Sequence, residues 1–259
     1  MIKNLFMPRR RRPAANGLAR AAAALHPRAM ISDPRAALFA DVDTWVFDLD
    51  NTLYPARYNL FELVDRKIGA FVAALLGVDR GAARRVQKSY FREHGTTLRG
   101  LMLNHGVDPQ AFLEFVHDID VARVPPSPDL DAALARLDGR KLVFTNASAR
   151  HAERVMERLG VAHHFEGVFD IADAGYVPKP HPETYAAMVA RFAFDPRAAA
   201  MIEDIARNLE PAAAIGMTTV WLRNNSEWGR EGSDGAYIDL VIDDLAGWLA
   251  GLGDGAPAA

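Results

Sequence analysis

The 259-residue chain contains no cysteine. This absence excludes disulfide bonds, zinc–cysteine sites, iron–sulfur clusters and thiol catalysis, and it is typical of a reducing compartment. The chain also lacks any apolar run near the ~20 residues of a membrane-spanning helix. A GxGxxG turn after a strand, a Walker-type phosphate loop and a GxSxG nucleophile elbow are missing as well. We therefore expect a soluble, cytoplasmic protein whose chemistry uses none of these motifs.

The charge of the chain is unevenly distributed. Its formal net charge is only −3, but residues 1–30 contain seven basic residues and no acidic one. Residues 31–259 therefore have a formal net charge of −10. Residues 1–40 are predicted to be a flexible basic extension, because arginines, prolines and alanines follow one another there without an apolar period. Other interpretations are an export signal or presequence, translation that starts at Met30, and a tether to a membrane surface or, in a scaffold protein, to nucleic acid. We expect no stable nucleic-acid partner.

Short apolar segments of strand length alternate with helical patterns along most of the chain. This alternation predicts an α/β fold with a doubly wound parallel sheet, the Rossmann-like arrangement. Half of the residues are apolar, which is enough for a large core. The predicted strands are TWVFDLD (44–50), KLVFTN (141–146), GVFDI (167–171), AAMIED (199–204), TTVWLR (218–223) and DLVI (239–242).

One region interrupts the alternation. Between residues 59 and 120, four segments of helix length have apolar residues at three- and four-residue spacing and no strand pattern. We predict an inserted helical cap over residues 57–123, a core formed by 41–56 and 124–250, and a flexible tail at 251–259. An insertion at this point would lie over the strand ends and act as a lid.

Polar residues follow several of the predicted strands. Asp48 and Asp50 end the first, Thr145 and Asn146 the second, and Glu203 and Asp204 the fourth, while Lys179 lies between two prolines. A lone DxD pair is common and says little. The ordered set is far more specific, because the carboxyl ends of parallel strands meet at one edge of the sheet, where ligands bind.

The motifs that carry these residues resemble those of a known family. DLDNTLYP, FTNAS, PKPHPETY and IEDIARNL are similar to the haloacid dehalogenase-like superfamily of phosphotransferases, over residues 44 to about 245. GTTLRGL and VHDID in the cap resemble the pyrimidine 5'-nucleotidase subgroup. The resemblance implies hydrolysis of a phosphate monoester through a covalent aspartyl-phosphate.

The resemblance also implies a role for each catalytic candidate. Asp48 would be the nucleophile and Asp50 the general acid and base. Thr145 and the backbone amide of Asn146 would bind the phosphoryl group, and Lys179 would tie it to Asp48. A carboxyl group at position 50 argues against carbon–halogen cleavage, because the dehalogenases lack it.

A cation is expected as well, because two carboxylates repel a phosphate dianion. Asp48, the backbone carbonyl of Asp50 and Asp204 offer the oxygen ligands that Mg²⁺ prefers. Glu203 would bind the metal through water, orient Asp204, pair with an arginine or cap a helix; the sequence leaves these alternatives open. The adjacent His163 and His164 have no third ligand at metal spacing, so we expect a loop or a hydrogen-bonded pair there and no zinc site.

Substrate choice is assigned to the cap and its hinge. Tyr54, Arg99 and His117 are predicted to contact the substrate, although Tyr54 could instead pack the hinge and His117 could form a structural hydrogen bond. The predicted substrate is a pyrimidine nucleoside 5'-monophosphate. The alternatives are a sugar-phosphate or phosphoglycolate phosphatase, or a phosphomutase. The sequence does not indicate whether the protein forms oligomers.

Overall fold

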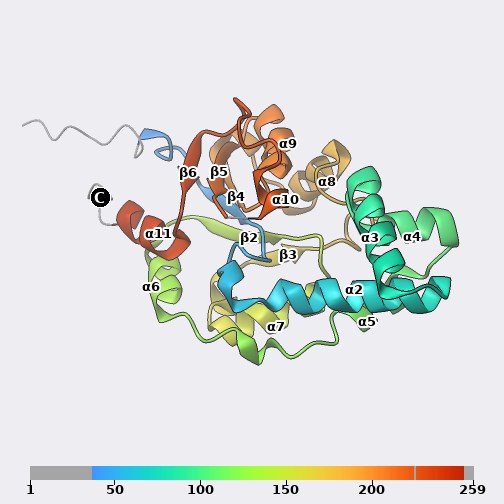
Figure 1. Ribbon diagram of the computed structural model, residues 1–259. Helices are drawn as coiled ribbons and strands as arrows, with labels where there is room; N and C mark the ends of the chain where they lie inside the picture. The colour runs from blue at the N-terminus through green and yellow to red at the C-terminus, as the bar shows by residue number, and fades with distance from the viewer. Residues whose placement is uncertain (1–36, 225, 254–259) are drawn as a thin grey trace, which may run out of the picture. The chain divides into compact units, whose positions relative to one another are not determined.

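Six short strands form one parallel sheet in the computed structural model (Figure 1). The spatial order β3-β2-β1-β4-β5-β6 reverses direction between β1 and β4, as in a doubly wound fold. The predicted α/β class is therefore confirmed, and each predicted strand overlaps an observed one. The strands are β1 (Thr44–Phe47), β2 (Arg140–Phe144), β3 (Gly167–Phe169), β4 (Ala199–Glu203), β5 (Thr218–Leu222) and β6 (Leu240–Ile242).

Helices cover both faces of the sheet, because side chains along each strand alternate between two apolar clusters. Trp45 and Phe47 of β1 belong to the cluster that includes α6, α7 and α11, and Val46 belongs to the cluster that includes α8 and α9. The core helices are α6 (Pro128–Arg136), α7 (Ala149–Leu159), α8 (Pro182–Phe192), α9 (Glu210–Ala214), α10 (Glu227–Arg230) and α11 (Leu245–Gly253). Short 3-10 helices are η1 (Ala56–Tyr58), η2 (Val121–Arg123), η3 (Ala162–His164), η4 (Pro196–Ala198) and η5 (Ala206–Leu209).

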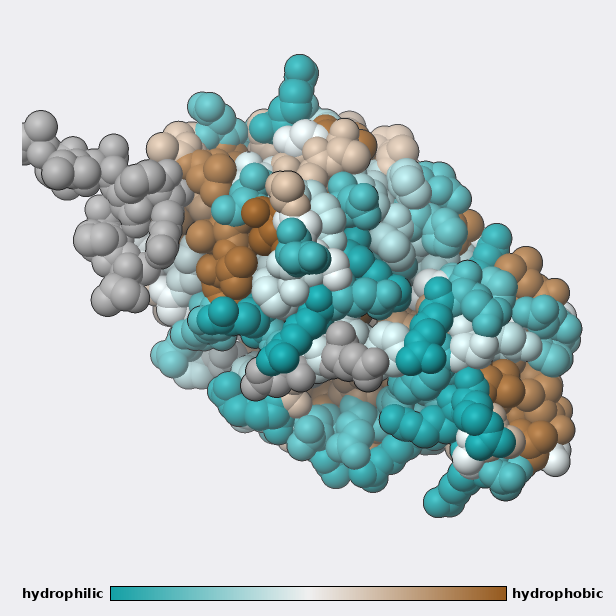
Figure 2. All heavy atoms as spheres, turned by 45° about the horizontal axis from the view of Figure 1, so that its top comes forward, coloured by the Kyte–Doolittle hydropathy of each residue, from teal (hydrophilic) through white to brown (hydrophobic). Residues whose placement is uncertain are grey.

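Four helices lie between β1 and β2 in the region where the apolar spacing predicts an insertion, and we call them the cap. They are α2 (Leu60–Leu76), α3 (Arg80–His94), α4 (Thr97–His105) and α5 (Pro109–Val116). The side chains of Asp79, Thr96 and Asp108 accept hydrogen bonds from the first turns of α3, α4 and α5, which fixes where these helices begin. Figure 2 shows hydrophobic side chains on the surface of the cap. Leu75, near the end of α2, and Leu103, near the end of α4, are exposed hydrophobic residues.

The structure describes residues 37–224 and 226–253. Most of the predicted extension and of the predicted tail lies outside these residues. The described parts of both segments pack against the core. Phe39 is buried and stacks on Trp45 with ring centroids 5.6 Å apart, and α11 continues to Gly253. Within the described residues, no helix is both long and apolar enough to cross a membrane.

Candidate active site

The site lies at the carboxyl edge of the sheet, where the strand order reverses. Asp48 directly follows β1. Glu203 is the last residue of β4, the hydrogen-bonded neighbour of β1, and Asp204 directly follows it. The Asp48 backbone N donates to the Ile202 carbonyl at 2.9 Å, which extends the pairing of the two strands by one residue. Neighbouring parallel strands therefore bring the three carboxylates together, although about 155 residues separate them in sequence.

Lys179 connects these strand ends. Its ammonium donates to Asp48 Oδ1 at 2.7 Å, to Glu203 Oε2 at 2.7 Å and to the Phe144 carbonyl at 2.9 Å. Three donated bonds satisfy an ammonium group. Burial acts to lower the pKa of Lys179, but the charges of the two carboxylates outweigh it and raise the pKa above its ordinary value. Lys179 is therefore a fixed, buried positive charge beside the predicted nucleophile.

Asn146 holds the backbone of this lysine. Its side-chain Oδ1 accepts a hydrogen bond from the Lys179 backbone N at 2.9 Å. The preceding residue, Thr145, is also buried, and its Oγ1 accepts from the Ala147 backbone N at 3.0 Å. The loop after β2 thus fixes both the lysine and the threonine hydroxyl at the sheet edge. The sequence motif identified Asn146 through its backbone amide, and the structure adds the role of its side chain.

Asp48, Glu203 and Asp204 form a carboxylate cluster that fits a divalent cation. One oxygen from each of the three buried side chains lies within 4.8 Å of the others. Burial, followed by the charge of Glu203, raises the pKa of Asp48 to about 7 and also raises that of Asp204. Three carboxylates face one ammonium, so their full ionisation requires further positive charge. Hard oxygen donors in a partly closed site are what Mg²⁺ binds.

The hydrogen bonds of Glu203 decide among the roles that the sequence left open for it. Its Oε2 accepts from Lys179, and its Oε1 accepts from the Ile205 backbone N at 3.2 Å. Both oxygens thus have protein partners, and the cation that it pairs with is a lysine. Asp204 Oδ2 accepts from Asn224 Nδ2 at 2.8 Å. We therefore assign Glu203 to positioning Lys179, which leaves Asp48 and Asp204 as the candidate direct ligands of a cation.

Asp50 is held by two side chains of the core. Its Oδ1 accepts a hydrogen bond from the Tyr54 hydroxyl at 2.5 Å, and His151 Nε2 lies 3.4 Å from the same oxygen. Burial acts to raise the pKa of Asp50, but the bonds with His151 and Tyr54 lower it. Tyr54 is fully buried, so the hinge-packing alternative describes it better than base stacking does. Sequence reasoning missed His151, whose only signal was a histidine on the apolar face of α7.

His117 connects the cap to this part of the core. It follows α5 directly, its ring stacks on that of His151 with centroids 4.4 Å apart, and its Nδ1 lies 2.9 Å from Ser148 Oγ. Burial lowers the pKa of His117 from 6.5 to about 3. The imidazole is therefore neutral at physiological pH, and a neutral ring can stack on a second histidine without charge repulsion.

The depressed pKa of His117 predicts acid sensitivity. The unfolded chain binds a proton at this residue below pH 6.5, whereas the folded protein does so only near pH 3. The free energy of unfolding should therefore fall as the pH drops through this window, by at most about 1.4 kcal/mol per pH unit from this residue. Urea unfolding at several pH values in this window should show a smaller decrease in the free energy of unfolding for His117→Asn than for the unaltered protein. An equal decrease in the variant would contradict the assignment.

A cavity of about 240 Å³ joins the carboxylates to the cap. Its lining includes Asp48, Asp50, Thr145, Asn146, Lys179, Glu203, Asp204 and His117. The described lining residues include neither Tyr54 nor Arg99, so two of the predicted substrate contacts are not placed at this cavity. Side chains that the sequence did not single out line the remainder, among them Phe61, Ile68, Gln87, Phe91, Phe112 and Trp228. Their contribution depends on how the cap helices pack, which the motifs do not encode.

Known proteins are similar to this chain in sequence. A family model for haloacid dehalogenase-like hydrolases matches residues 42–216. Phosphate metabolism protein 8 of Saccharomyces cerevisiae is 29% identical over 187 residues, which cover 66% of this chain and 58% of that protein. The match thus spans less than two thirds of the yeast protein.

Solved structures resemble the chain in fold. A HAD phosphatase from Thermococcus onnurineus aligns with a TM-score of 0.55 and 18% identity, over 82% of this chain and 96% of that one. A variant of CbbY from Rhodobacter sphaeroides, in complex with xylulose-1,5-bisphosphate, aligns with a TM-score of 0.58 and 20% identity, over 79% and 95%. At these identities the likeness shows the fold alone.

Proposed function

The chain belongs to the haloacid dehalogenase-like hydrolase family, and we propose that it is a Mg²⁺-dependent phosphatase that hydrolyses pyrimidine nucleoside 5'-monophosphates. The observation that carries the proposal is the buried contact of Lys179 with Asp48, 2.7 Å long, beside the carboxylate cluster. A cation fixed against a strand-end aspartate is suited to hold a phosphoryl group in front of that carboxylate.

The proposed reaction has two displacements. In the first, an Asp48 carboxylate oxygen attacks phosphorus, the bond between phosphorus and the ester oxygen breaks, and Asp50 gives its proton to the leaving alkoxide. In the second, Asp50 takes a proton from water, the water oxygen attacks phosphorus, and the bond to Asp48 breaks to release phosphate. The arriving phosphoryl charge raises the pKa of Asp50, which favours the protonated form that the first displacement needs.

The other residues of the site hold the phosphoryl group. Thr145 and the Asn146 backbone amide would bind its oxygens, and Lys179 would neutralise charge next to Asp48. Mg²⁺ bound by Asp48, Asp204 and the Asp50 carbonyl would supply further positive charge for the phosphoryl oxygens. Tyr54 and His151 keep the Asp50 carboxyl in a fixed orientation.

The cavity supports a leaving group with a flat, apolar face. Phe61 of α2, Phe91 of α3 and Trp228 of α10 line it from three helices, and Gln87 and His117 provide polar atoms nearby. Aromatic walls can pack against a nucleobase, and polar groups can contact its edge. A sugar phosphate, like the bisphosphate bound to CbbY, would instead need hydrogen-bond partners for several hydroxyl groups. Sugar phosphates and phosphoglycolate therefore remain the alternative substrates to be tested.

Phosphate release from a panel of esters tests this proposal. We expect turnover of uridine and cytidine 5'-monophosphates to exceed that of purine nucleotides, sugar phosphates and phosphoglycolate, and to stop when EDTA removes Mg²⁺. Adding Mg²⁺ back should restore it, while Ca²⁺ serves as a control for general ionic effects. Turnover without a divalent cation would overturn the metal requirement. A preference for sugar phosphates would overturn the substrate assignment alone.

A further inference from the structure

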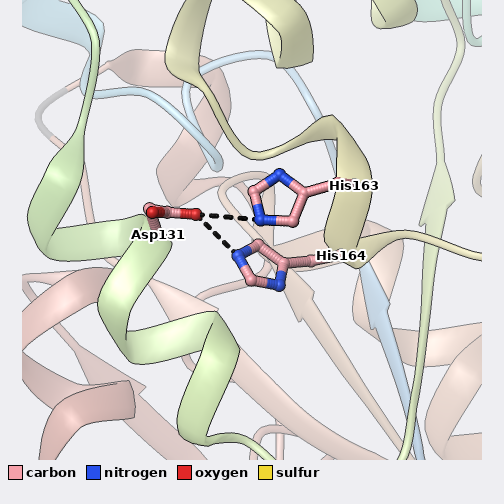
Figure 3. A group of neighbouring side chains, drawn as sticks. All are labelled: Asp131, His163 and His164. Carbon is pink, nitrogen blue, oxygen red and sulfur yellow. Dashed lines mark hydrogen bonds and ion pairs between the residues drawn. The ribbon is translucent and has the colours of Figure 1, made fainter.

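A second cluster of side chains that can bind a metal lies outside the candidate active site. His163 and His164 of η3 both direct Nε2 toward one oxygen of Asp131, at 3.3 Å and 2.7 Å (Figure 3). The two imidazole rings lie 4.0 Å apart, and one ligand atom from each of the three residues lies within 4.8 Å of the others. Asp131 thus supplies the third ligand that the adjacent histidines lack in sequence, from 32 residues away.

This cluster is at the opposite edge of the sheet. It lies on η3, between the end of α7 and the start of β3, and therefore beside the amino end of a strand. The candidate active site occupies the carboxyl ends. Figure 1 shows α6, which carries Asp131, on the side of the sheet away from the cap. The cluster is thus a separate feature that the proposed hydrolysis does not use.

The backbone holds the three side chains in place. The Ser127 backbone N, just before α6, donates to the Leu159 carbonyl at the end of α7 at 2.9 Å, which ties the two ligand-bearing segments together. The Phe165 ring, directly after the histidines, packs edge-on against Phe47 with centroids 5.8 Å apart. A metal would therefore find its ligands already close, with little chain entropy left to lose.

We propose that Asp131, His163 and His164 bind a divalent transition metal, with Zn²⁺ as the representative ion. Two imidazoles and one carboxylate are a donor set that zinc sites use, with water in the fourth position. In tetrahedral coordination at 2.0–2.1 Å, ligand atoms lie about 3.4 Å apart. The distance of 3.3 Å from His163 to Asp131 already matches this value, and the distance of 2.7 Å from His164 must lengthen slightly.

The exposure of the ligands favours such an adjustment. The His163 side chain is 66% exposed and that of Asp131 43%, whereas the His164 side chain is 11% exposed. His164 thus anchors the site, and the other two ligands can move outward around an ion that reaches the site from solvent. The exposed side of the cluster provides room for the water ligand. Imidazole ligands select Zn²⁺, Ni²⁺ or Cu²⁺ over Mg²⁺, so this site and the carboxylate cluster differ in metal preference.

Zn²⁺ titration of the full chain, without a histidine tag and in excess Mg²⁺, tests the proposal. Calorimetry should show one saturable Zn²⁺-binding event, and Zn²⁺ should also raise the unfolding temperature. His163→Ala and Asp131→Asn should each weaken this event at least about tenfold. Zn²⁺ should also shift the ring ¹⁵N resonances of His163 and His164, which would identify the ligands directly. Circular dichroism checks that each variant is folded. We expect His163→Ala to fold because the His163 side chain is largely exposed.

Two control variants separate this site from other histidines and carboxylates. His181→Ala removes an exposed histidine whose Nδ1 lies 3.9 Å from Glu183, a pair without a second imidazole, and should leave the event unchanged. Asp204→Asn alters the carboxylate cluster and should also leave it unchanged. No saturable binding, or equal affinity in His163→Ala and the unaltered chain, would overturn the proposal. Equal weakening by His181→Ala would show surface binding only and would also overturn it.

Discussion

Replacing Asp48 with asparagine is expected to lower phosphate release by at least about 10³-fold while the protein stays folded. The carboxylate is the proposed nucleophile, and a neutral amide cannot form the aspartyl-phosphate. The fold should tolerate the change because the asparagine oxygen can still accept the bond from Lys179. One of three mutually repelling buried carboxylates is also removed. The measurements are phosphate release with Mg²⁺ and thermal unfolding of the same preparation.

A covalent-intermediate assay makes this prediction specific. Acid quenching during turnover should trap a phosphorylated chain in the unaltered protein and none in Asp48→Asn. Asp129→Asn, at an exposed aspartate of α6, serves as the matched control and should retain both activity and the trapped intermediate. Undiminished turnover in Asp48→Asn would refute the proposed nucleophile. Loss of activity in the control as well would indicate a general effect of removing carboxylates.

The sheet and the cap could be predicted because their signals are local. A buried strand such as β1 is a short apolar run, and the helices of the cap repeat apolar residues at three- and four-residue spacing. The order of strands then brings residues from β1 and β4 together without further information. The proximity of Asp48 and Glu203 follows from that topology, because they lie at the ends of neighbouring strands. Lys179 comes from the loop between β3, at the end of the sheet, and α8, so its contact with both carboxylates depends on the path of this loop.

Tyr54 shows where such reasoning reaches its limit. An aromatic residue at a hinge is compatible with stacking on substrate and with packing in the core, and only the backbone path after β1 decides between them. Here the ring is buried and the hydroxyl contacts Asp50. The missed third ligand of His163 and His164 has a similar cause. Asp131 reaches them only because α6 packs beside the end of α7, a long-range contact that no local pattern encodes.

Removal of the Lys179 ammonium should cause the largest loss of stability among single substitutions at this site. In Lys179→Met, the side chains of Asp48 and Glu203 and the Phe144 carbonyl all lose a donor in a buried environment. Breaking a buried ion pair by deleting one partner typically costs about 3–5 kcal/mol, because the remaining charge is uncompensated. We expect a decrease of this size in the free energy of unfolding, measured with urea in EDTA, together with loss of phosphate release.

Lys141→Met is the matched control for this prediction. Lys141 is also buried, but its ammonium contacts the backbone carbonyls of Leu137 and Gly139, so its removal leaves no unpaired carboxylate. Lys141→Met should lower the free energy of unfolding by about 1–3 kcal/mol, the range for buried acceptors that lose a partner. A decrease in Lys179→Met no larger than in Lys141→Met would show that the lysine does not balance the carboxylates.

A second substitution separates the charge of Lys179 from its packing. If the unpaired carboxylates cause the instability, Glu203→Gln should stabilise the Lys179→Met background, although it destabilises the unaltered protein by replacing a charged partner of Lys179 with a neutral one. The sign of the effect of Glu203→Gln thus reverses between the two backgrounds, which measures the coupling of the pair directly. The double variant should recover stability without recovering phosphate release, because a methionine cannot hold a phosphoryl group next to Asp48. Recovery of activity together with stability would mean that Lys179 has only a structural role.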